Sequence, residues 1–160
     1  MKKIIAHRGN IRGPNPSQEN KPSFIDAAIE KGFDVEVDIW LIDDLWFLGH
    51  DEPEYRIDKR FLKHRSDFLW CHAKNINALT ELLNNKMHCF FHESDLVTLT
   101  SKGFIWTYPG AELTSNSVCL MPENFSIELE KHFPNHKYDF KQCYGICTDF
   151  PLKYSEVVFS

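Results

Sequence analysis

The chain has 160 residues, of which 42% are hydrophobic and 26% are charged, and these proportions are typical of one globular domain spanning residues 1–160. Its 23 acidic residues outnumber 18 Lys and Arg, and the formal net charge of -5 argues against duplex nucleic acid as a partner, because phosphate backbones require a positive surface. No segment approaches the roughly 18 consecutive apolar residues of a membrane span, and the first apolar run is too short for a signal peptide, so we expect a cytoplasmic protein.

Eight short segments rich in β-branched and aromatic residues are bounded by turn-forming residues, and each predicts a strand. In chain order these segments are Lys3–His7, Asp34–Ile42, Leu45–His50, Asp67–Lys74, His88–His92, Phe104–Tyr108, Ser117–Met121 and Tyr144–Thr148. Helical patterns are found at Pro22–Lys31, Ile57–Lys63, Ile76–Asn84 and Asn124–His132. Strands that alternate with helices are typical of parallel pairing through right-handed crossovers.

Eight such strands favour an α/β barrel, although the chain is short for one. A complete (β/α)8 barrel takes about 250 residues, and the connections after Glu93 and after Pro109 are too short or too prone to β-structure for full outer helices. We therefore predict a trimmed TIM-type (β/α)8 barrel that lacks some outer helices on one flank, with an open doubly wound sheet as the alternative. Strand faces without helices need cover from loops or a second subunit, and a homodimer would supply it.

Two acidic residues share one face of the segment Asp34–Ile42. Side chains alternate along a strand, so Glu36 and Asp38 point to one side while the apolar residues between and beside them point to the other. Two carboxylates on a buried strand are costly unless a positive charge lies between them, and a divalent metal ion supplies that charge. The alternative is that this face is solvated at the edge of an antiparallel sheet.

Histidines end two of the predicted strands. His7 ends the first and is followed by Arg8, and His50 ends the third. Residues at the C-terminal ends of parallel barrel strands gather at one end of the barrel, so we expect both imidazoles beside the acidic pair. An imidazole exchanges protons near neutral pH, so the two could serve as acid and base in phosphodiester cleavage. Arg8 offers a fork of donors to phosphate oxygens.

Five segments of the chain are similar to motifs of a known family. They are His7-Arg8-Gly9, Glu19-Asn20, Gly32-Phe33-Asp34-Val35-Glu36-Val37-Asp38, Gly49-His50-Asp51 and Gly145-Ile146-Cys147-Thr148-Asp149-Phe150-Pro151. With these motifs the sequence resembles the glycerophosphodiester phosphodiesterases, within the superfamily of phosphatidylinositol-specific phospholipase C-like phosphodiesterases. The chain would be an unusually short member of that family.

The resemblance implies a phosphoric diester hydrolase of lipid metabolism that acts on a small glycerophosphodiester with a divalent metal ion, Mg²⁺ or Ca²⁺. It also implies roles for single residues: Glu36 and Asp38 as metal ligands, His7 and His50 as the acid–base pair, and Arg8 as a phosphate contact. In the family the attacking hydroxyl is often the substrate's own neighbouring one, which gives a cyclic phosphate that water then opens.

The fourth predicted strand departs from the family's pattern. The family places an acidic metal ligand two residues before a lysine, whereas here Lys74 matches the lysine and His72 stands in the place of the acid. An imidazole ligand favours Mn²⁺ or Zn²⁺ over Mg²⁺ or Ca²⁺. The alternative is that His72 contacts the phosphate or the ligands rather than the metal. Lys74 would bind phosphate, and Glu19 would orient the side chain of Arg8 or His7.

Two further residues are candidates for the wall of the site. His88 and His92 share a face of one predicted strand, and if Phe90 points inward with them, His92 reaches the rim of the site. Trp106 is a candidate for the pocket lining, although aromatic residues near strand ends more often serve barrel packing.

Two other functions fit the same motifs. A phospholipase or lyase acting on a lipid head group would need an exposed apolar rim, and a catalytically silent barrel would bind a phosphodiester or a partner protein. Retention of both histidines and both acids argues against the silent barrel, because a binding module has no evident need for two histidines at strand ends.

Overall fold

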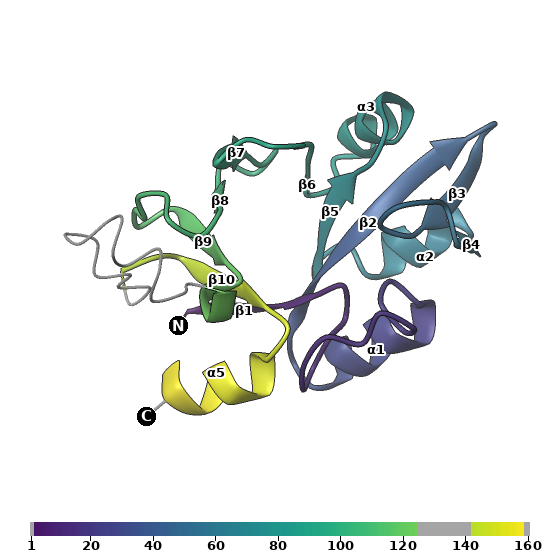
Figure 1. Ribbon diagram of the computed structural model, residues 1–160. Coiled ribbons are helices and arrows are strands. Elements are labelled where there is room, and N and C mark those ends of the chain that lie inside the picture. The colour runs from purple at the N-terminus through teal and green to yellow at the C-terminus, as the bar shows by residue number, and fades with distance from the viewer. Residues whose placement is uncertain (1, 125–141, 159–160) are drawn as a thin grey trace.

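The computed structural model describes residues 2–124 and 142–158, and its strands form one sheet with helices packed outside it (Figure 1). The strands are β1 (Lys3–His7), β2 (Asp34–Ile42), β3 (Leu45–Leu48), β4 (Tyr55–Ile57), β5 (Leu69–Ala73), β6 (Cys89–Phe90), β7 (Val97–Leu99), β8 (Ile105–Thr107), β9 (Ser117–Leu120) and β10 (Gly145–Thr148). The helices are α1 (Pro22–Glu30), α2 (Lys59–His64), α3 (Ile76–Asn84) and α5 (Pro151–Val158), with a 3-10 helix η1 (Pro122–Asn124). Among the described helices, none has both the length and the apolar character to cross a membrane.

Seven of the strands run parallel, in the order β6-β5-β2-β1-β10-β9-β8. The other three are antiparallel additions: β3 and β4 extend from β2, and β7 pairs with β8. The sheet curls, so that β5 and β6 face β8 and β9 across its interior (Figure 1). The prediction of a mixed α/β fold with a barrel-like sheet is therefore confirmed.

The curled sheet is not closed into a complete barrel by hydrogen bonds between the backbones of its edge strands. In the part of the chain that the structure describes, no strand pairing joins β6 to β7 or β8. Single hydrogen bonds bridge this opening, among them Ser101 N to Cys89 O at 2.8 Å and Thr98 Oγ1 to Phe91 O at 3.0 Å. We call the opening between residues 89–92 and 97–101 the seam. The chain forms a curled sheet with a seam rather than a complete (β/α)8 barrel.

The predicted strands are all present, with the same or shorter bounds. The sequence does not predict β4 or β7, since each has only three residues and depends on antiparallel partners. It also does not predict α5, which begins at Pro151, a residue well suited to the first turn of a helix. The predicted helix Asn124–His132 lies outside the described residues apart from Asn124, which ends η1.

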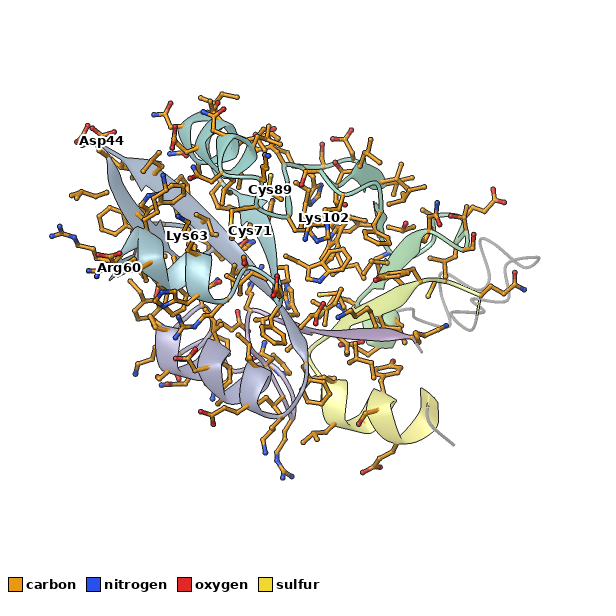
Figure 2. The ribbon with its side chains drawn as sticks, turned by 180° about the vertical axis from the view of Figure 1, so that it is seen from behind. Asp44, Arg60, Lys63, Cys71, Cys89 and Lys102 are labelled. Atoms are coloured by element: carbon orange, nitrogen blue, oxygen red, sulfur yellow. The ribbon has the colours of Figure 1, made fainter. Side chains whose placement is uncertain are left out.

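The third predicted strand runs antiparallel to its neighbour, which corrects the expectation of a parallel strand with His50 at its C-terminal end. β2 is long enough to pair with β1 through its first half and with β3 through its second half. Asp43 and Asp44 have φ of 48 and 63 and form the tight turn between β2 and β3, and Figure 2 shows Asp44 at its tip. The chain then returns, and Gly49 N donates to Asp38 O at 3.2 Å. His50 reaches the acidic pair through this hairpin.

The two faces of the sheet pack differently. On the outer face, Val35, Val37 and Ile39 of β2 are fully buried beneath α1 and α3. Cys71 of β5 and Cys89 of β6 lie side by side on the same face (Figure 2). The interior is filled by a second apolar group: Ile5, Trp70, Phe90, Trp106, Val118, Leu120 and Cys147. The inner face also carries the buried polar side chains of Glu36 and Asp38 on β2 and of His72 on β5.

One flank lacks outer helices. Every residue from β6 to β9 is described, and no helix lies between these strands. Apolar side chains on this flank are exposed, including Leu96 at 64% and Leu99 at 70%. The predicted loss of outer helices on one flank is confirmed, and the homodimer that would cover it stays a prediction.

We predict that Gly49→Ala lowers the free energy of unfolding by about 2 kcal/mol and displaces the loop that carries His50. Gly49 has φ +148, and a Cβ built there lies 2.1 Å from the backbone oxygen of Glu52. Gly32→Ala is the matched control, because Gly32 also has positive φ (+86) but its Cβ would meet nothing within 4 Å. Urea unfolding measures both, and equal losses would contradict the steric argument.

Candidate active site

A cavity of about 250 Å³ opens at the end of the curled sheet where the parallel strands finish. It is lined by His7, Arg8, Glu36, His50, His72, Lys74, His92, Glu93, Trp106, Tyr108 and Leu120. Eight of the ten residues that the sequence suggests for the site are among them. The other two, Asp38 and Glu19, contact Arg8 from behind the cavity wall.

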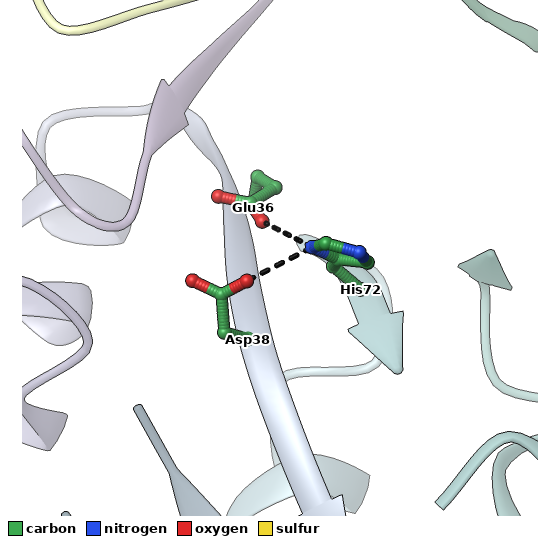
Figure 3. A group of neighbouring side chains, drawn as sticks. All are labelled: Glu36, Asp38 and His72. Carbon is green, nitrogen blue, oxygen red and sulfur yellow. Dashed lines mark hydrogen bonds and ion pairs between the residues drawn. The ribbon is translucent and has the colours of Figure 1, made fainter. Parts of the chain in front are cut away.

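Figure 3 shows the three candidate metal ligands, Glu36 and Asp38 from β2 and His72 from the adjacent β5. The parallel register pairs Asp38 with His72, and it brings His72 Nδ1 to 2.9 Å from Asp38 Oδ1 and 3.9 Å from Glu36 Oε1. A ligand atom from each residue lies within 4.8 Å of the others, and all three residues are buried. Water screens their charges weakly at this depth. We refer to these three residues as the ligand cluster.

The two carboxyl groups of the ligand cluster have pKa values shifted in opposite directions. Burial raises the pKa of Glu36, and the neighbouring Asp38 carboxylate raises it further. Burial also acts to raise the pKa of Asp38, but the hydrogen bond and charge of His72 and the charge of Arg8 hold it at about 2. Glu36 is therefore the carboxylate whose ionised form gains most from an added cation.

The hydrogen bonds of His72 suit metal ligation. Its Nε2 lies 3.2 Å from the backbone oxygen of His92, and a carbonyl only accepts, so Nε2 carries a proton. Its Nδ1 faces the carboxylate oxygens of Asp38 and Glu36, which are also acceptors, so a proton or a metal cation is required between these atoms. A metal-ligating histidine commonly donates its other ring N–H to a carbonyl. The donor set therefore fits a divalent metal ion.

Two cations adjoin Asp38. Arg8 Nε lies 3.2 Å from Asp38 Oδ2, and Lys74 Nζ lies 3.9 Å from Asp38 Oδ1. Arg8 also donates from Nη1 to Glu19 Oε2 at 3.0 Å, so Glu19 contacts one of the two side chains that the sequence suggests it orients. The backbone N–H of Arg8 donates to Glu36 Oε2 at 3.2 Å. Both cations line the cavity, where they can bind a phosphate group.

His7 is held by a residue to which the sequence analysis assigns no role. His7 Nδ1 lies 2.8 Å from Asp149 Oδ1, and Nε2 lies 4.0 Å from Glu36 Oε2. Burial acts to lower the pKa of His7, but the hydrogen bond to Asp149 and the charge of Glu36 raise it overall. With Nδ1–H donated to Asp149, Nε2 is the basic nitrogen on the cavity side. The sequence signal that could have identified this contact is the segment at the end of β10 that contains Asp149. Because β10 pairs in parallel with β1, the ends of these two strands lie next to each other.

Two buried asparagines, which the sequence analysis also leaves without a role, support these contacts. Asn20 Nδ2 donates to Asp38 Oδ2 at 2.8 Å, and Asn20 Oδ1 accepts from Asp38 N at 2.9 Å. Asn10 Nδ2 donates to Glu19 Oε1 at 2.9 Å and to Asp149 Oδ1 at 2.8 Å. The carboxylates behind Arg8 and His7 are therefore fixed by neutral donors as well as by charges.

His50 is the more accessible of the two catalytic candidates. Its side chain is 39% exposed, against 16% for His7. Its Nδ1 lies 2.7 Å from Asp51 Oδ1, and the preceding Gly49 O accepts from Trp40 Nε1 at 2.7 Å. This imidazole can exchange protons with solvent while it lines the cavity.

The wall formed by β8 and β9 carries Trp106, Tyr108 and Leu120. The Trp106 ring stacks on Phe90 with centroids 4.6 Å apart. The Tyr108 hydroxyl is hydrogen-bonded to His92 Nε2. Both residues that the sequence suggests for the wall, His92 and Trp106, line the cavity, and the structure adds Tyr108 to them.

No family model matches the chain, and no curated protein matches it in sequence. A similar solved structure is the crystal structure of a glycerophosphodiester phosphodiesterase from Parabacteroides distasonis, with a TM-score of 0.50 and 12% sequence identity. The match covers 99% of this chain and 97% of that one. At this identity the likeness shows the fold alone: the chain shares the fold of that phosphodiesterase.

We expect Mn²⁺ to bind at the ligand cluster, and we expect Glu36→Gln to weaken its affinity about tenfold or more, because a ligand and a negative charge are lost. Titration of free Mn²⁺ followed by electron paramagnetic resonance measures the dissociation constant. Glu81→Gln is the matched control, since Glu81 lies on α3 outside the cavity. Equal Mn²⁺ affinity in Glu36→Gln and the parent protein would rule out this site.

Proposed function

We propose that the chain is a metal-dependent phosphodiesterase that hydrolyses a small glycerophosphodiester-like substrate, with His7 and His50 as the acid–base pair. The observation that carries this proposal is the gathering of both imidazoles, the ligand cluster and two cations around one cavity. The shared fold with a glycerophosphodiester phosphodiesterase supports it independently. These groups together supply the base, the acid and the charge stabilisation that cleavage of a phosphodiester requires.

His7 is suited to act as the base. Asp149 accepts the Nδ1 proton, so Nε2 can take the proton of the attacking hydroxyl, which belongs to water or to the substrate itself. A new P–O bond forms as the bond to the leaving alcohol breaks, and His50 gives a proton to the departing alkoxide. His50 regains that proton from solvent, to which it is partly exposed.

Arg8 and Lys74 are suited to bind the phosphate. Their contacts with Asp38 hold both side chains in place along the cavity, and Glu19 fixes the guanidinium from behind. Fixed cations stabilise the charge that develops on phosphoryl oxygens, because they need no reorganisation during the reaction. A divalent metal ion bound by the ligand cluster would supply Lewis-acid stabilisation of the same oxygens. The resemblance favours Mg²⁺ or Ca²⁺, and the imidazole of His72 favours Mn²⁺ or Zn²⁺.

A second candidate is a phospholipase or lyase that acts on a lipid head group. The exposed apolar rim that this function requires is present: Phe91 is 40% exposed and Leu96 is 64% exposed. Phe91 directly precedes His92, and Leu96 O accepts from Tyr108 N, so both lie next to residues that line the cavity. Comparing cleavage of a soluble glycerophosphodiester with cleavage of the matching phospholipid in vesicles separates the two functions.

The test of the proposed function is cleavage of a soluble glycerophosphodiester in the presence of each divalent metal ion. We expect His50→Ala to lower kcat by about 10²-fold or more, because proton transfer to the leaving group is lost. His64→Ala, on the exposed surface of α2, should keep the parent rate. Parental activity in His50→Ala would contradict the assignment, and no activity with any metal ion would favour the silent barrel.

Asp149→Asn should lower kcat/KM by about 10²–10⁴-fold, because His7 loses the acceptor that fixes its tautomer. Asp149 helps to raise the pKa of His7. A base works in its deprotonated form, so this variant should also move the acidic limb of the pH profile to lower pH. An unchanged limb in the pH dependence of kcat/KM would show that His7 is not the base.

A further inference from the structure

His92 joins the two sides of the seam. Its backbone oxygen accepts from His72 Nε2 at 3.2 Å on the β5 side, and its Nε2 is hydrogen-bonded to the Tyr108 hydroxyl on the β8 side. Its ring centroid lies 5.4 Å from that of His72 and 4.6 Å from that of Tyr108. His92 is 8% exposed. One buried residue therefore links the ligand cluster to the opposite wall of the cavity.

The surroundings of His92 select its tautomer. Its Nδ1 is buried without a hydrogen-bond partner. A buried N–H without an acceptor is rarer and costlier than a bare acceptor nitrogen, so the ring proton belongs on Nε2. His92 Nε2–H then donates to the Tyr108 hydroxyl oxygen. The hydroxyl proton of Tyr108 is therefore not donated to His92.

Tyr108 brings a polar group to an apolar wall. Its neighbours on the cavity wall from β8 and β9 are Trp106 and Leu120. Burial and the charge of Glu36 raise the pKa of Tyr108 to about 12, so its hydroxyl stays protonated near neutral pH. The cavity also contains Arg8 and Lys74, the two candidate phosphate-binding cations. A phosphate bound by those cations would find a hydroxyl donor on the facing wall.

We propose that Tyr108 donates a hydrogen bond to the phosphate group of the substrate, and that His92 is the positioning residue that orients the Tyr108 hydroxyl. This assignment rests on the proposed function only in that the ligand carries a phosphate group. Tyr108 would add a neutral hydrogen-bond donor to the two cations Arg8 and Lys74. His92, the residue that bridges the seam, would thereby have a role in substrate binding. A donor fixed by a buried partner loses little freedom when the ligand binds.

Calorimetric titration with inorganic phosphate tests the contact without requiring cleavage. We expect Tyr108→Phe to raise the dissociation constant of phosphate about tenfold, the effect of a hydrogen bond to a charged group. Tyr144→Phe is the matched control, because Tyr144 packs in the same aromatic group but does not line the cavity. Equal phosphate affinity in Tyr108→Phe and the parent, or no phosphate binding by the parent, would overturn the proposal.

A double-mutant cycle tests the positioning role. His92→Phe keeps the ring but removes the hydrogen bond, so it should weaken phosphate binding in the parent and have no further effect in Tyr108→Phe. An equal loss in both backgrounds would overturn the role of His92. Phosphate binding that depends on Tyr108 in a protein that cleaves no diester would refute the proposed function and leave this assignment standing.

Discussion

The site depends on two carboxylates held next to each other on one buried strand. Glu36 and Asp38 both face the interior of the curled sheet, and their repulsion has to be offset by positive charge. The chain supplies that charge from Arg8 after β1 and from Lys74 after β5, and His72 Nδ1 lies 2.9 Å from Asp38 Oδ1. The turn after β1 places Arg8 in a left-handed conformation, φ 52, and its backbone N–H then also reaches Glu36. The strands β1, β2 and β5 are therefore organised around one electrostatic requirement.

Strand alternation makes the ligand cluster predictable from the sequence, because a period of two is a local property. It assigns Glu36 and Asp38 to one face, whereas His72 on β5 is identified by the resemblance, from its place two residues before Lys74. Contacts that depend on pairing between distant segments are not local. Asp149 reaches His7 across 142 positions in the sequence, through the register of β10 with β1. The direction of β3 is likewise set by a two-residue turn, which the strand pattern does not reveal.

The seam and the exposed flank have the same cause. Parallel strands are usually joined by a crossover with a helix, and the connections from β6 to β9 contain no helix, although β8 and β9 still pair in parallel. β7 occupies this space instead and pairs antiparallel to β8, so the ladder between β6 and β8 is absent in the described residues. Single hydrogen bonds span the gap instead, from His92 to Tyr108, from Thr98 to Phe91 and from Ser101 to Cys89. Of these residues, His92 also lines the cavity together with Tyr108, so the hydrogen bond between them belongs both to the closure of the sheet and to the cavity wall.

An imidazole in place of a third carboxylate changes the charge balance of the site. The two acids of the ligand cluster carry at most two negative charges. Arg8 and Lys74 lie 3.2 Å and 3.9 Å from Asp38 and carry two positive charges, and Arg8 shares its charge with Glu19. A third carboxylate in place of His72 would add one more negative charge beside Glu36 and Asp38. With His72 the site needs less added positive charge, and the metal ion that we propose for the ligand cluster would serve the chemistry rather than the folding of the chain.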